Sequence, residues 1–583
     1  MSGLSEVVIK IDGKNICEDN VLDYIETCSC INSLPYAIIR IHDFFFTSSE
    51  SENLCANNPV FKIGAKVEIE FGDQEEIKSV FEGVLLDKAF KMDAQEGFCF
   101  LELHVYTFAY KMHIVKKNAF YSDKTDSDII KDIISKYDGI KPKLGNMALK
   151  HESIIQRDIT DWDFINMRSQ VYGFVVCVSG DSITVDSPQN VSSGVKTIFG
   201  ENILEMNLKI NSSHQIEKAC GKIWDKKNQK IKDISSESVK DNFFDKIKAS
   251  DITKNTDKQE FSFLHDGVGE EEMKALVNGI MSLNRLAKVI GTITIEGNAD
   301  VKCNSTIDIE RCAENFNGKA YVSGVKHIFE NGDWVTKIFI GFSPLKNKDL
   351  WHNVKLLQHI SGIKYGKVVK IDGDKESEFR IFVNIPLFHN EGEGIWCRLA
   401  TFYASSCSGA FFFPEVDDEV IVSFVDSDPR EAIVLGVVYN AKNKPKIEKI
   451  DAKNEIKGIY TKGGLEISFD EKDKIVKIKT ATNREIIISD KDESIIFGND
   501  GDTFSLTKDG VKIKSSKDII VEGKNINFNA NGSVNIKAKS DVKIEGSNIS
   551  TKGSMGVEIK GGNGAKLESS GITEIKGSMV NIN

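Results

Sequence analysis

Two short stretches carry residue types that could do chemistry. Glu391 and Glu393 lie just before Trp396, and two carboxyl groups flanking a sugar bond are what glycoside hydrolysis requires. His151 and Glu152 begin the pattern of a zinc-protease helix, but the sequence that follows lacks the second histidine. A solvated turn explains the two glutamates more simply. We therefore predict that the chain is not an enzyme and has no catalytic residues and no cofactor.

Cysteines are the other candidate ligands. The chain has 11 of them, and only Cys28 and Cys30 are close together. This spacing does not complete a four-ligand zinc site, and an odd, scattered set does not resemble a disulfide framework. We expect the two side chains to alternate between the faces of one strand and to pack there, so we predict reduced thiols and no bound metal.

The elements that would position any site are short strands, and the last seventy or so residues show them most plainly. Pairs of apolar or small residues, separated by one residue, begin at positions 511, 519, 526, 534, 542, 549, 557, 565, 573 and 580. The alternation in Val511-Lys512-Ile513 places the apolar side chains on one face, so each unit is expected to be a half-buried strand ended by a turn. Because each unit contributes only two apolar side chains, the strands of one chain cannot enclose a filled apolar interior. We predict a triangular prism wound from three identical chains.

A single-chain β-helix, as in polysaccharide-cleaving enzymes, is the alternative for this segment. Its coils usually need twenty or more residues each, and the steps of seven or eight residues therefore favour the prism. Residues 463–506 show the same alternation with wider spacing, and we interpret them as the base of the prism.

Residues 362–440 contain five strand patterns separated by turns rich in glycine and aspartate, which favours an OB-fold barrel. OB-folds that bind nucleic acid need a basic groove with stacking aromatic residues, and Arg380, Arg398 and Arg430 are too few and too scattered. The net charge of −12 shows no basic block either. We predict no nucleic-acid partner.

One strand pattern occurs twice in the amino-terminal part. FKIGAKVEIE at 61–70 matches VKCNSTIDIE at 301–310 in strand pattern, and each is followed by a Gly-Val pair, at 83–84 and 324–325. This duplication predicts two related β-barrels in one chain. Three chains would then place six similar units in a ring, which could match a six-fold tube.

Helical periodicity appears between the two predicted barrels. The patterns predict helices over 126–137, 161–172 and 270–288, with Asp126 and Ser127 as possible caps of the first. We interpret all three as packing helices. The predicted domains are a hub at 1–360 with both barrels, an OB-fold at 361–440, a linker at 441–462 and the prism at 463–583.

Two stretches of the OB region, Phe413 to Val422 and Asp428 to Gly436, resemble the hallmark sequences of the VgrG family. VgrG is the spike of the type VI secretion system, and similar stretches occur in hub and needle proteins of contractile phage tails and extracellular particles. The resemblance extends over almost the whole chain. It departs from the family at Asp417, where a glycine is common, which puts one turn in doubt but not the barrel. The expected fold is mainly β: two hub barrels with a few helices, an OB barrel and a trimeric triangular β-prism.

The resemblance implies a homotrimeric spike that caps a hexameric, Hcp-like tail tube, contacts baseplate components and punctures a membrane. Because the chain stops directly after its tenth unit, we expect Met579, Val580, Asn581, Ile582 and Asn583 to dock a PAAR-like tip protein. Effectors would be separate proteins. The start lacks a signal-peptide pattern, so assembly is expected in the cytoplasm, followed by injection. A phage-tail or extracellular-particle hub remains an open alternative, and a β-helical carbohydrate-active enzyme is disfavoured.

Overall fold

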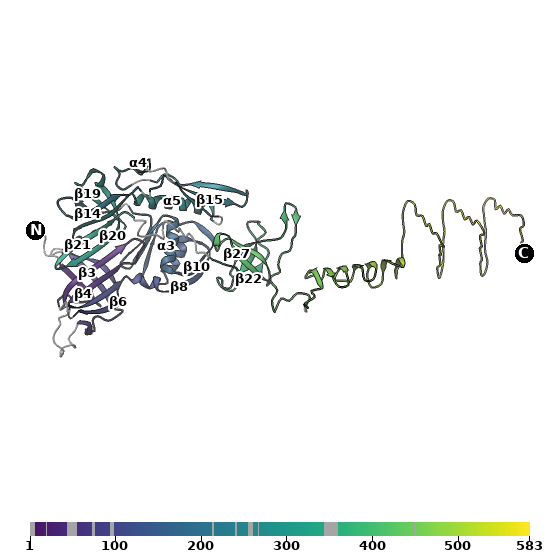
Figure 1. Cartoon of the computed structure of the whole chain (residues 1–583), viewed down its shortest axis with the longest axis horizontal. Helices are drawn as coiled ribbons and strands as arrows, with labels where there is room; N and C mark the ends of the chain where they lie inside the picture. Colours follow the sequence, from purple (N-terminus) through teal and green to yellow (C-terminus); the bar gives the residue numbers. More distant parts are fainter. Residues whose placement is uncertain are drawn as a thin grey trace. The chain divides into compact units, whose positions relative to one another are not determined.

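The computed structural model describes residues 6–18, 20–42, 55–72, 76–93, 98–189, 191–212, 215–239, 242–254, 260–265, 268–342, 360–447 and 450–582. The chain forms two compact units, Met1–Pro445 and Lys446–Asn583, which are described separately below (Figure 1). No helix among these described ranges combines the length and apolar character needed to cross a membrane.

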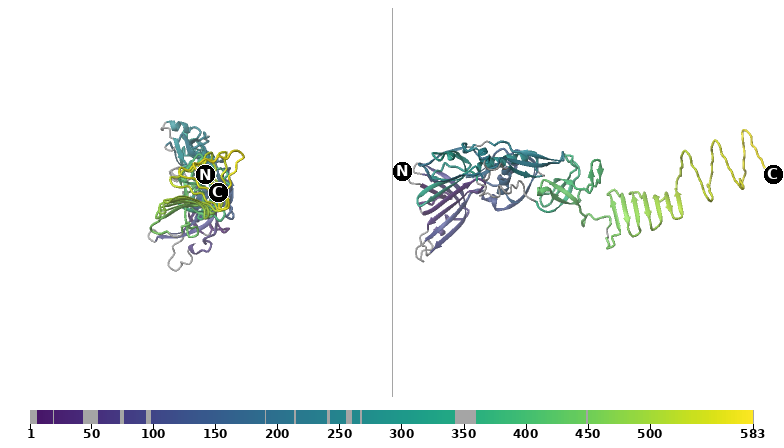
Figure 2. Two further views of the ribbon diagram at one scale, coloured as in Figure 1. Left: turned by 90° about the vertical axis from the view of Figure 1, so that its right-hand side faces the viewer. Right: turned by 45° about the horizontal axis from the view of Figure 1, so that its top comes forward.

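A sheet of thirteen strands forms the framework of the first unit (Figures 1 and 2). Its first half consists of β1 (Glu6–Ile11), β2 (Lys14–Asn15), β3 (Val21–Cys30), β4 (Tyr36–His42), β5 (Lys66–Gly72), β6 (Ile77–Asp93) and β7 (Phe98–Tyr106). Its second half consists of β13 (Ser192–Ile198), β14 (Ile203–Ile210), β18 (Val289–Glu296), β19 (Ser305–Glu310), β20 (Gly318–Glu330) and β21 (Asp333–Ile340). Each half has its own apolar core.

The strand pattern that occurs twice in the amino-terminal part corresponds to two equivalent hairpins. The segment at 61–70 contains β5, which pairs antiparallel with β6, and the segment at 301–310 contains β19, which pairs antiparallel with β20. The halves join where β3 pairs antiparallel with β20. The duplication predicted from the sequence is therefore present, but the two related parts share one continuous sheet of thirteen strands rather than forming two separate closed barrels.

Helices and small sheets lie between the two halves in the sequence. The helices are α1 (Lys111–Ile114), α2 (Asp126–Ile134), α3 (Asp161–Val171), α4 (Ala249–Lys254) and α5 (Glu270–Leu286), with short 3-10 turns at Cys55–Asn57, Phe108–Tyr110 and Glu314–Phe316. The small sheets are β8 (Lys116–Thr125) with β10 (Lys150–Thr160); β9 (Lys141–Leu144), β11 (Val175–Ser179) and β12 (Ser182–Asp186); and β15 (Lys218–Asp225), β16 (Lys230–Ser235) and β17 (Glu260–Leu264). The three predicted helices correspond to α2, α3 and α5.

The cap of α2 differs from the prediction. Thr125, not Asp126 or Ser127, is the N-cap: its hydroxyl accepts from the amide of Asp128, whose carboxylate accepts from the amide of Thr125. This reciprocal arrangement satisfies amide groups that the first turn leaves unpaired. The Asp126 carboxylate is thereby left for contacts inside the protein. The helix also ends at Ile134, three residues before the predicted end.

Helices α3 and α5 lie against one apolar core, which contains Phe164 and Ile165 from α3 and Leu276 and Ile280 from α5. Their backbones meet at two glycines. A Cβ added to Gly279 would lie 2.5 Å from the amide nitrogen of Gly173, two residues after the end of α3. Only glycine permits this close approach.

The predicted OB-fold is a closed five-stranded barrel. Its strands are β22 (Lys364–Lys370), β23 (Ile381–Asn384), β24 (Ile395–Leu399), β27 (Glu419–Phe424) and β28 (Ala432–Val437), in the order β22-β23-β24-β28-β27. A small hairpin, β25 (Ala404–Ser405) with β26 (Ser408–Gly409), interrupts it. A 3-10 turn at Val425–Ser427 precedes β28.

The turn at Asp417 explains the departure from the family sequence. Asp417 has φ +75°, in the left-handed region that glycine adopts readily and that aspartate tolerates better than most residues. Its carboxylate pairs with Lys367 across the barrel edge at 2.6 Å. The turn is therefore kept although the glycine is not.

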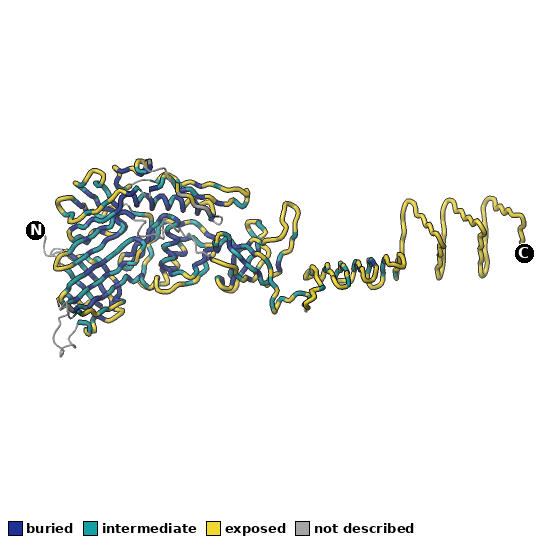
Figure 3. Tube along the Cα trace, viewed as in Figure 1, coloured by how far each residue is buried: buried dark blue, intermediate teal, exposed yellow. Residues whose placement is uncertain are grey.

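The second unit begins with an antiparallel meander of seven strands, which lie side by side in Figure 2. They are β29 (Ile456–Tyr460), β30 (Glu466–Asp470), β31 (Ile475–Lys479), β32 (Glu485–Ser489), β33 (Ser494–Gly498), β34 (Thr503–Thr507) and β35 (Gly510–Lys514). Of the ten predicted repeat units, the first lies in β35. The others form no strand in the single chain, and every described residue from 516 to 582 is exposed (Figure 3). A strand needs a hydrogen-bonded neighbour, and these segments find none within their own chain.

Candidate functional site

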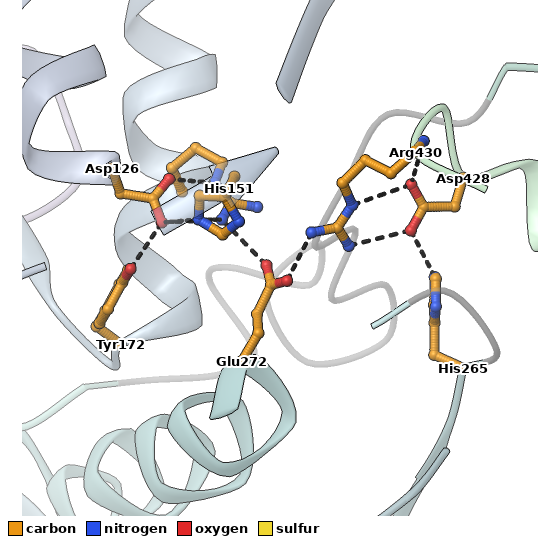
Figure 4. A network of polar contacts seen from close by, with 8 residues as sticks. Asp126, His151, Tyr172, His265, Glu272, Asp428 and Arg430 are labelled. Atoms are coloured by element: carbon orange, nitrogen blue, oxygen red, sulfur yellow. Dashed lines mark hydrogen bonds and ion pairs between the residues drawn. The ribbon is translucent and has the colours of Figure 1, made fainter. Parts of the chain in front are cut away.

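A connected series of buried charged side chains extends from the helices of the first unit to its OB barrel. It consists of Asp126, Arg168, Glu272, Arg430 and Asp428, and we call it the charge network. Figure 4 shows that Glu272 lies between the two ends, with Asp126 on one side and Arg430 on the other. The first turn of α2 supplies Asp126, α3 supplies Arg168, α5 supplies Glu272, and the loop before β28 supplies the other two.

The hub end of the network is centred on Asp126. Arg168 donates to its two carboxylate oxygens from Nε at 2.7 Å and from Nη2 at 3.0 Å. The Tyr172 hydroxyl donates to Oδ2 at 2.7 Å, and Nε2 of His151 lies 2.8 Å from the same oxygen. The side chains of Asp126 and Arg168 are fully buried. Burial removes water from both charges of an ion pair, and further hydrogen bonds of this kind are needed to offset that cost.

The barrel end repeats the same arrangement. Arg430 donates to Asp428 from Nη2 at 3.0 Å and from Nε at 3.2 Å. Its Nη1 donates to Oε2 of Glu272 at 2.5 Å, while Oε1 of Glu272 accepts from Nη2 of Arg168 at 3.0 Å. One carboxylate thus bridges two guanidinium groups, one from the hub and one from the barrel.

The charges in the network favour the ionised forms of Asp126 and Glu272. Burial alone would raise the pKa of Asp126, but the Arg168 guanidinium and the hydrogen bond with His151 outweigh burial and lower this pKa well below its ordinary range. Burial opposes ionisation of Glu272 as well, yet Arg430 and Arg168 lower the pKa of Glu272 to about 2. A carboxylate that stays ionised far below neutral pH is a poor general acid or base. The geometry fits a structural junction between hub and barrel.

A cavity of about 490 Å³ adjoins the network. Its lining includes Trp396 and the cations Arg380, Arg430 and Lys226. Arg380 already donates to Asp374 from Nη2 at 2.8 Å and from Nε at 3.0 Å, and Lys226 pairs with Glu431, whose pKa is raised by burial. Two of the three arginines named from the sequence, Arg380 and Arg430, are thus engaged in ion pairs within their own fold.

The predicted turn at the paired glutamates is present. Glu391 is exposed, and Glu393 accepts from the backbone amide of Asn390 at 2.8 Å. The Asn384 side chain donates to the carbonyl oxygens of Asn390 and Glu393 at 2.7 and 2.8 Å. These contacts close a turn between β23 and β24.

His151 contacts the charge network at Asp126, and the sequence patterns did not predict this network. Arg168 lies in the helix predicted over 161–172 and Arg430 in a hallmark stretch, but neither pattern indicates which residues they contact. Asp126 was interpreted as a helix cap, because residues just before a helix commonly have that role. The burial of Asp126 indicates its role in the network, and the sequence alone does not show that this carboxylate is buried.

The expectation that Cys28 and Cys30 point to opposite faces of their strand is wrong, whereas the expected reduced thiols are present. Residues two apart on a strand share a face, and both lie in β3 with their sulfur atoms 3.8 Å apart. Neither is in a disulfide, and both are partly buried.

The meander of the second unit presents two parallel columns of apolar side chains on one face. The first column, in ladder order, is Ile459, Ile467, Ile478, Ile486, Phe497, Phe504 and Ile513. The second is Phe469, Val476, Ile488, Ile495, Leu506 and Val511. All of these except Ile486 and Ile495 are exposed, whereas Ser468 and Lys477 on the opposite face are half-buried. We call this surface the apolar face.

The apolar face continues into the repeat, because Val511 and Ile513 are the first repeat unit. Further along, Phe528 and Ile559 are 76% and 82% exposed. At the end of the chain Met579, Val580, Asn581 and Ile582 are exposed, while Asn583 lies outside the described residues. Their predicted docking role stays a prediction.

Two family models match the sequence. Residues 2–331 match the model described as the Alg8 N-terminal domain, which is more than half of the chain. Residues 364–439 match the type VI secretion system/phage-baseplate injector OB domain. The second match covers the closed barrel described above.

Curated relatives share shorter stretches. The type VI secretion system spike protein VgrG1a of Pseudomonas aeruginosa is 33% identical over 84 residues, which cover 14% of this chain and 13% of the relative. VgrG3 of Vibrio cholerae serotype O1 is 43% identical over 54 residues, which cover 9% of this chain and 5% of the relative. The alignments thus span about an eighth or less of the length of these relatives.

Solved structures show the same fold over a longer range. The Francisella PdpA–VgrG complex, half-lidded, matches with a TM-score of 0.53 and 10% identity, covering 88% of this chain and 88% of the other. The lidless complex matches with a TM-score of 0.52 and 10% identity, covering 88% and 99%. These matches confirm the resemblance to VgrG at the level of fold. The chain belongs to the family of the Alg8 N-terminal domain, and its hub continues into an injector OB barrel of the VgrG kind.

Proposed function

We propose that the chain is the homotrimeric spike of a contractile injection system of the type VI kind. The observation that carries this proposal is the apolar face, because it runs through all seven strands of the meander and most of its side chains are exposed in the described part of the chain. Burying one Ile, Val or Phe side chain contributes roughly 1.5–3 kcal/mol. Burial of the apolar face between copies of the chain would therefore strongly favour self-association.

Three copies fit this face better than two. Each strand presents about two apolar side chains, and the repeat that follows continues the same pairing at steps of seven or eight residues. Three narrow faces can meet around one axis and enclose a dry core, while the opposite faces, which carry Ser468, Lys477 and Ser505 beside two isoleucines, stay outside it. Backbone groups of residues 516–582 would find strand neighbours in the other two chains.

Within this trimer the hub is proposed to dock on the tail tube. The two related halves of the thirteen-stranded sheet become six in a trimer, which matches a hexameric, Hcp-like tube. The OB barrel would form a collar, and the shaft would carry a PAAR-like tip protein on residues 579–583 and pierce the target membrane. Assembly would take place in the cytoplasm, among baseplate components, before injection.

Cargo is proposed to be separate from this chain. The Francisella VgrG that shares the fold was solved in complex with PdpA, which supports a spike that carries a partner protein. We propose no enzymatic role, so a panel of glycan substrates should show no turnover. The matching OB family is named for both type VI systems and phage baseplates, and a phage-tail hub therefore remains the second candidate.

Light scattering on the purified, full-length protein tests the proposal. The expected mass is three times the chain mass of 64.9 kDa, with elongated particles in negative-stain microscopy. A monomer at micromolar concentration, without elongated particles, would refute the spike.

A further inference from the structure

The thiols of Cys28 and Cys30 form a close pair on one face of β3. Their sulfur atoms are 3.8 Å apart, and both side chains are partly buried, so the pair is held by the sheet and still reached by solvent. Nothing in the charge network or the apolar face uses them.

The neighbouring strand β20 is shaped around this pair. Gly324 lies opposite Cys30 in the ladder, and a Cβ added to Gly324 would lie 2.5 Å from the Cys30 sulfur. Any larger residue at position 324 would have to displace the thiol. Glycine inside a strand ordinarily weakens it and often marks a place where another group approaches closely.

A cation faces the pair from the same strand. Lys326 lies opposite Cys28 in the ladder, and its ammonium pairs with Glu26 at 2.6 Å. The hydrogen bond with Cys30 and the positive field of Lys326 lower the pKa of the Cys28 thiol, although burial and the negative field of Glu26 oppose this shift. The thiolate is the form of cysteine that binds metals.

We infer that Cys28 and Cys30 form a two-sulfur site for a thiophilic monovalent cation, with Cu(I) as the probe. Two thiols lose their protons to solvent, two sulfur–copper bonds form, and copper stays Cu(I), so no oxidant or reductant is needed. Two protons leave and one Cu(I) enters, so the site gains one net negative charge, close to the ion pair of Lys326 with Glu26.

The number of ligands selects the cation. Zinc in structural sites takes four ligands, and the described part of the chain contains no group of three or more His, Cys, Asp or Glu side chains placed to hold a metal. Soft thiolate ligands favour Cu(I), which accepts two sulfur atoms. The site does not depend on the proposed spike function.

Copper titration of the full-length, reduced protein tests the inference. Cu(I) is supplied without oxygen in competition with bicinchoninate, and bound equivalents are compared among the wild type, Cys28→Ser, Cys30→Ser and Cys407→Ser. Cys407 is a matched control, because it is a single exposed thiol in the turn between β25 and β26. Both pair variants should lose one equivalent, and the control should lose none.

Gly324→Ala separates the geometry of the site from the mere presence of two thiols. It keeps both cysteines but crowds the Cys30 sulfur, so copper should bind at least about tenfold more weakly while circular dichroism stays unchanged. Copper X-ray absorption of the wild type should show two sulfur neighbours. The inference is overturned if Cys28→Ser keeps the wild-type number of equivalents, if copper has one sulfur neighbour, or if mass spectrometry finds the pair as a disulfide that excludes copper.

Discussion

Glu272 Oε2 accepts a hydrogen bond from Arg430 Nη1 at 2.5 Å, and the two residues are 158 positions apart in the sequence. The contact joins helix α5 of the hub to the loop that precedes β28 of the OB barrel. Because the other oxygen of Glu272 accepts from Arg168, removing this carboxylate leaves two buried guanidinium groups short of a partner.

Glu272→Ala is expected to destabilise the first unit by about 3–5 kcal/mol, the usual cost of leaving a buried charge unpaired. Urea denaturation followed by tryptophan fluorescence measures the change. Lys367→Ala is the matched control, since Lys367 and Asp417 form an ion pair with both side chains largely exposed, and its effect should stay below about 1 kcal/mol. Equal effects of the two substitutions would contradict the assignment.

Acid should weaken the network in a defined window. The pKa of Glu272 is lowered from 4.5 to about 2, so its contribution to stability is complete above pH 4.5 and is lost as the pH falls toward 2. The free energy of unfolding should therefore decline between these values, and less steeply in Glu272→Gln. Urea titrations at pH 7, 4.5 and 3 measure the slope, and identical slopes in both proteins would rule out the linkage.

The apolar face can be tested with two adjacent residues. Phe504 belongs to the first apolar column, and Ser505 points to the opposite face. Phe504→Asp should shift the protein from trimer to monomer, because it places a charge in the predicted dry core. Ser505→Asp should leave the trimer intact. Light scattering over a dilution series measures both, and dissociation of the serine variant alone would reverse the assigned faces.

The left-handed turn at Asp417 has its own prediction. A β-branched side chain is strongly disfavoured at φ +75°, so Asp417→Val should destabilise the OB barrel by about 1–3 kcal/mol. Asp417→Gly should stay within about 1 kcal/mol of the wild type, because glycine adopts this φ freely while the exposed ion pair with Lys367 is lost. Thermal unfolding of the two variants gives the comparison.

Local patterns predicted much of the fold. The five strands of the barrel and the helices α2, α3 and α5 follow from alternation and helical spacing, which are properties of neighbouring residues. The sheet that joins the two hub halves does not, since the pairing of Cys30 with Gly324 brings together residues far apart in the sequence. Periodicity identifies a strand without naming its neighbour.

Local sequence patterns could not predict the charge network. Asp126 and Asp428 lie at its two ends, and only the folded chain shows that Arg168, Glu272 and Arg430 connect them. A threonine cap at position 125 could not be preferred over Asp126 or Ser127, because all three residue types cap helices. The error at Cys28 and Cys30 was of another kind: strand geometry alone places residues two apart on one face.

The exposed stretch from 516 to 582 also determines the order in which the molecule can fold. Its backbone groups form no strand pairs among the residues that the structure describes, so in the proposed trimer this stretch would complete folding only when other copies arrive, whereas the first unit has its own cores and could fold during synthesis. Completion of the shaft should then depend on protein concentration. Until that encounter, a newly made chain exposes apolar side chains that proteases cleave and chaperones bind, so the half-life of an unassembled chain should be set by its last seventy residues.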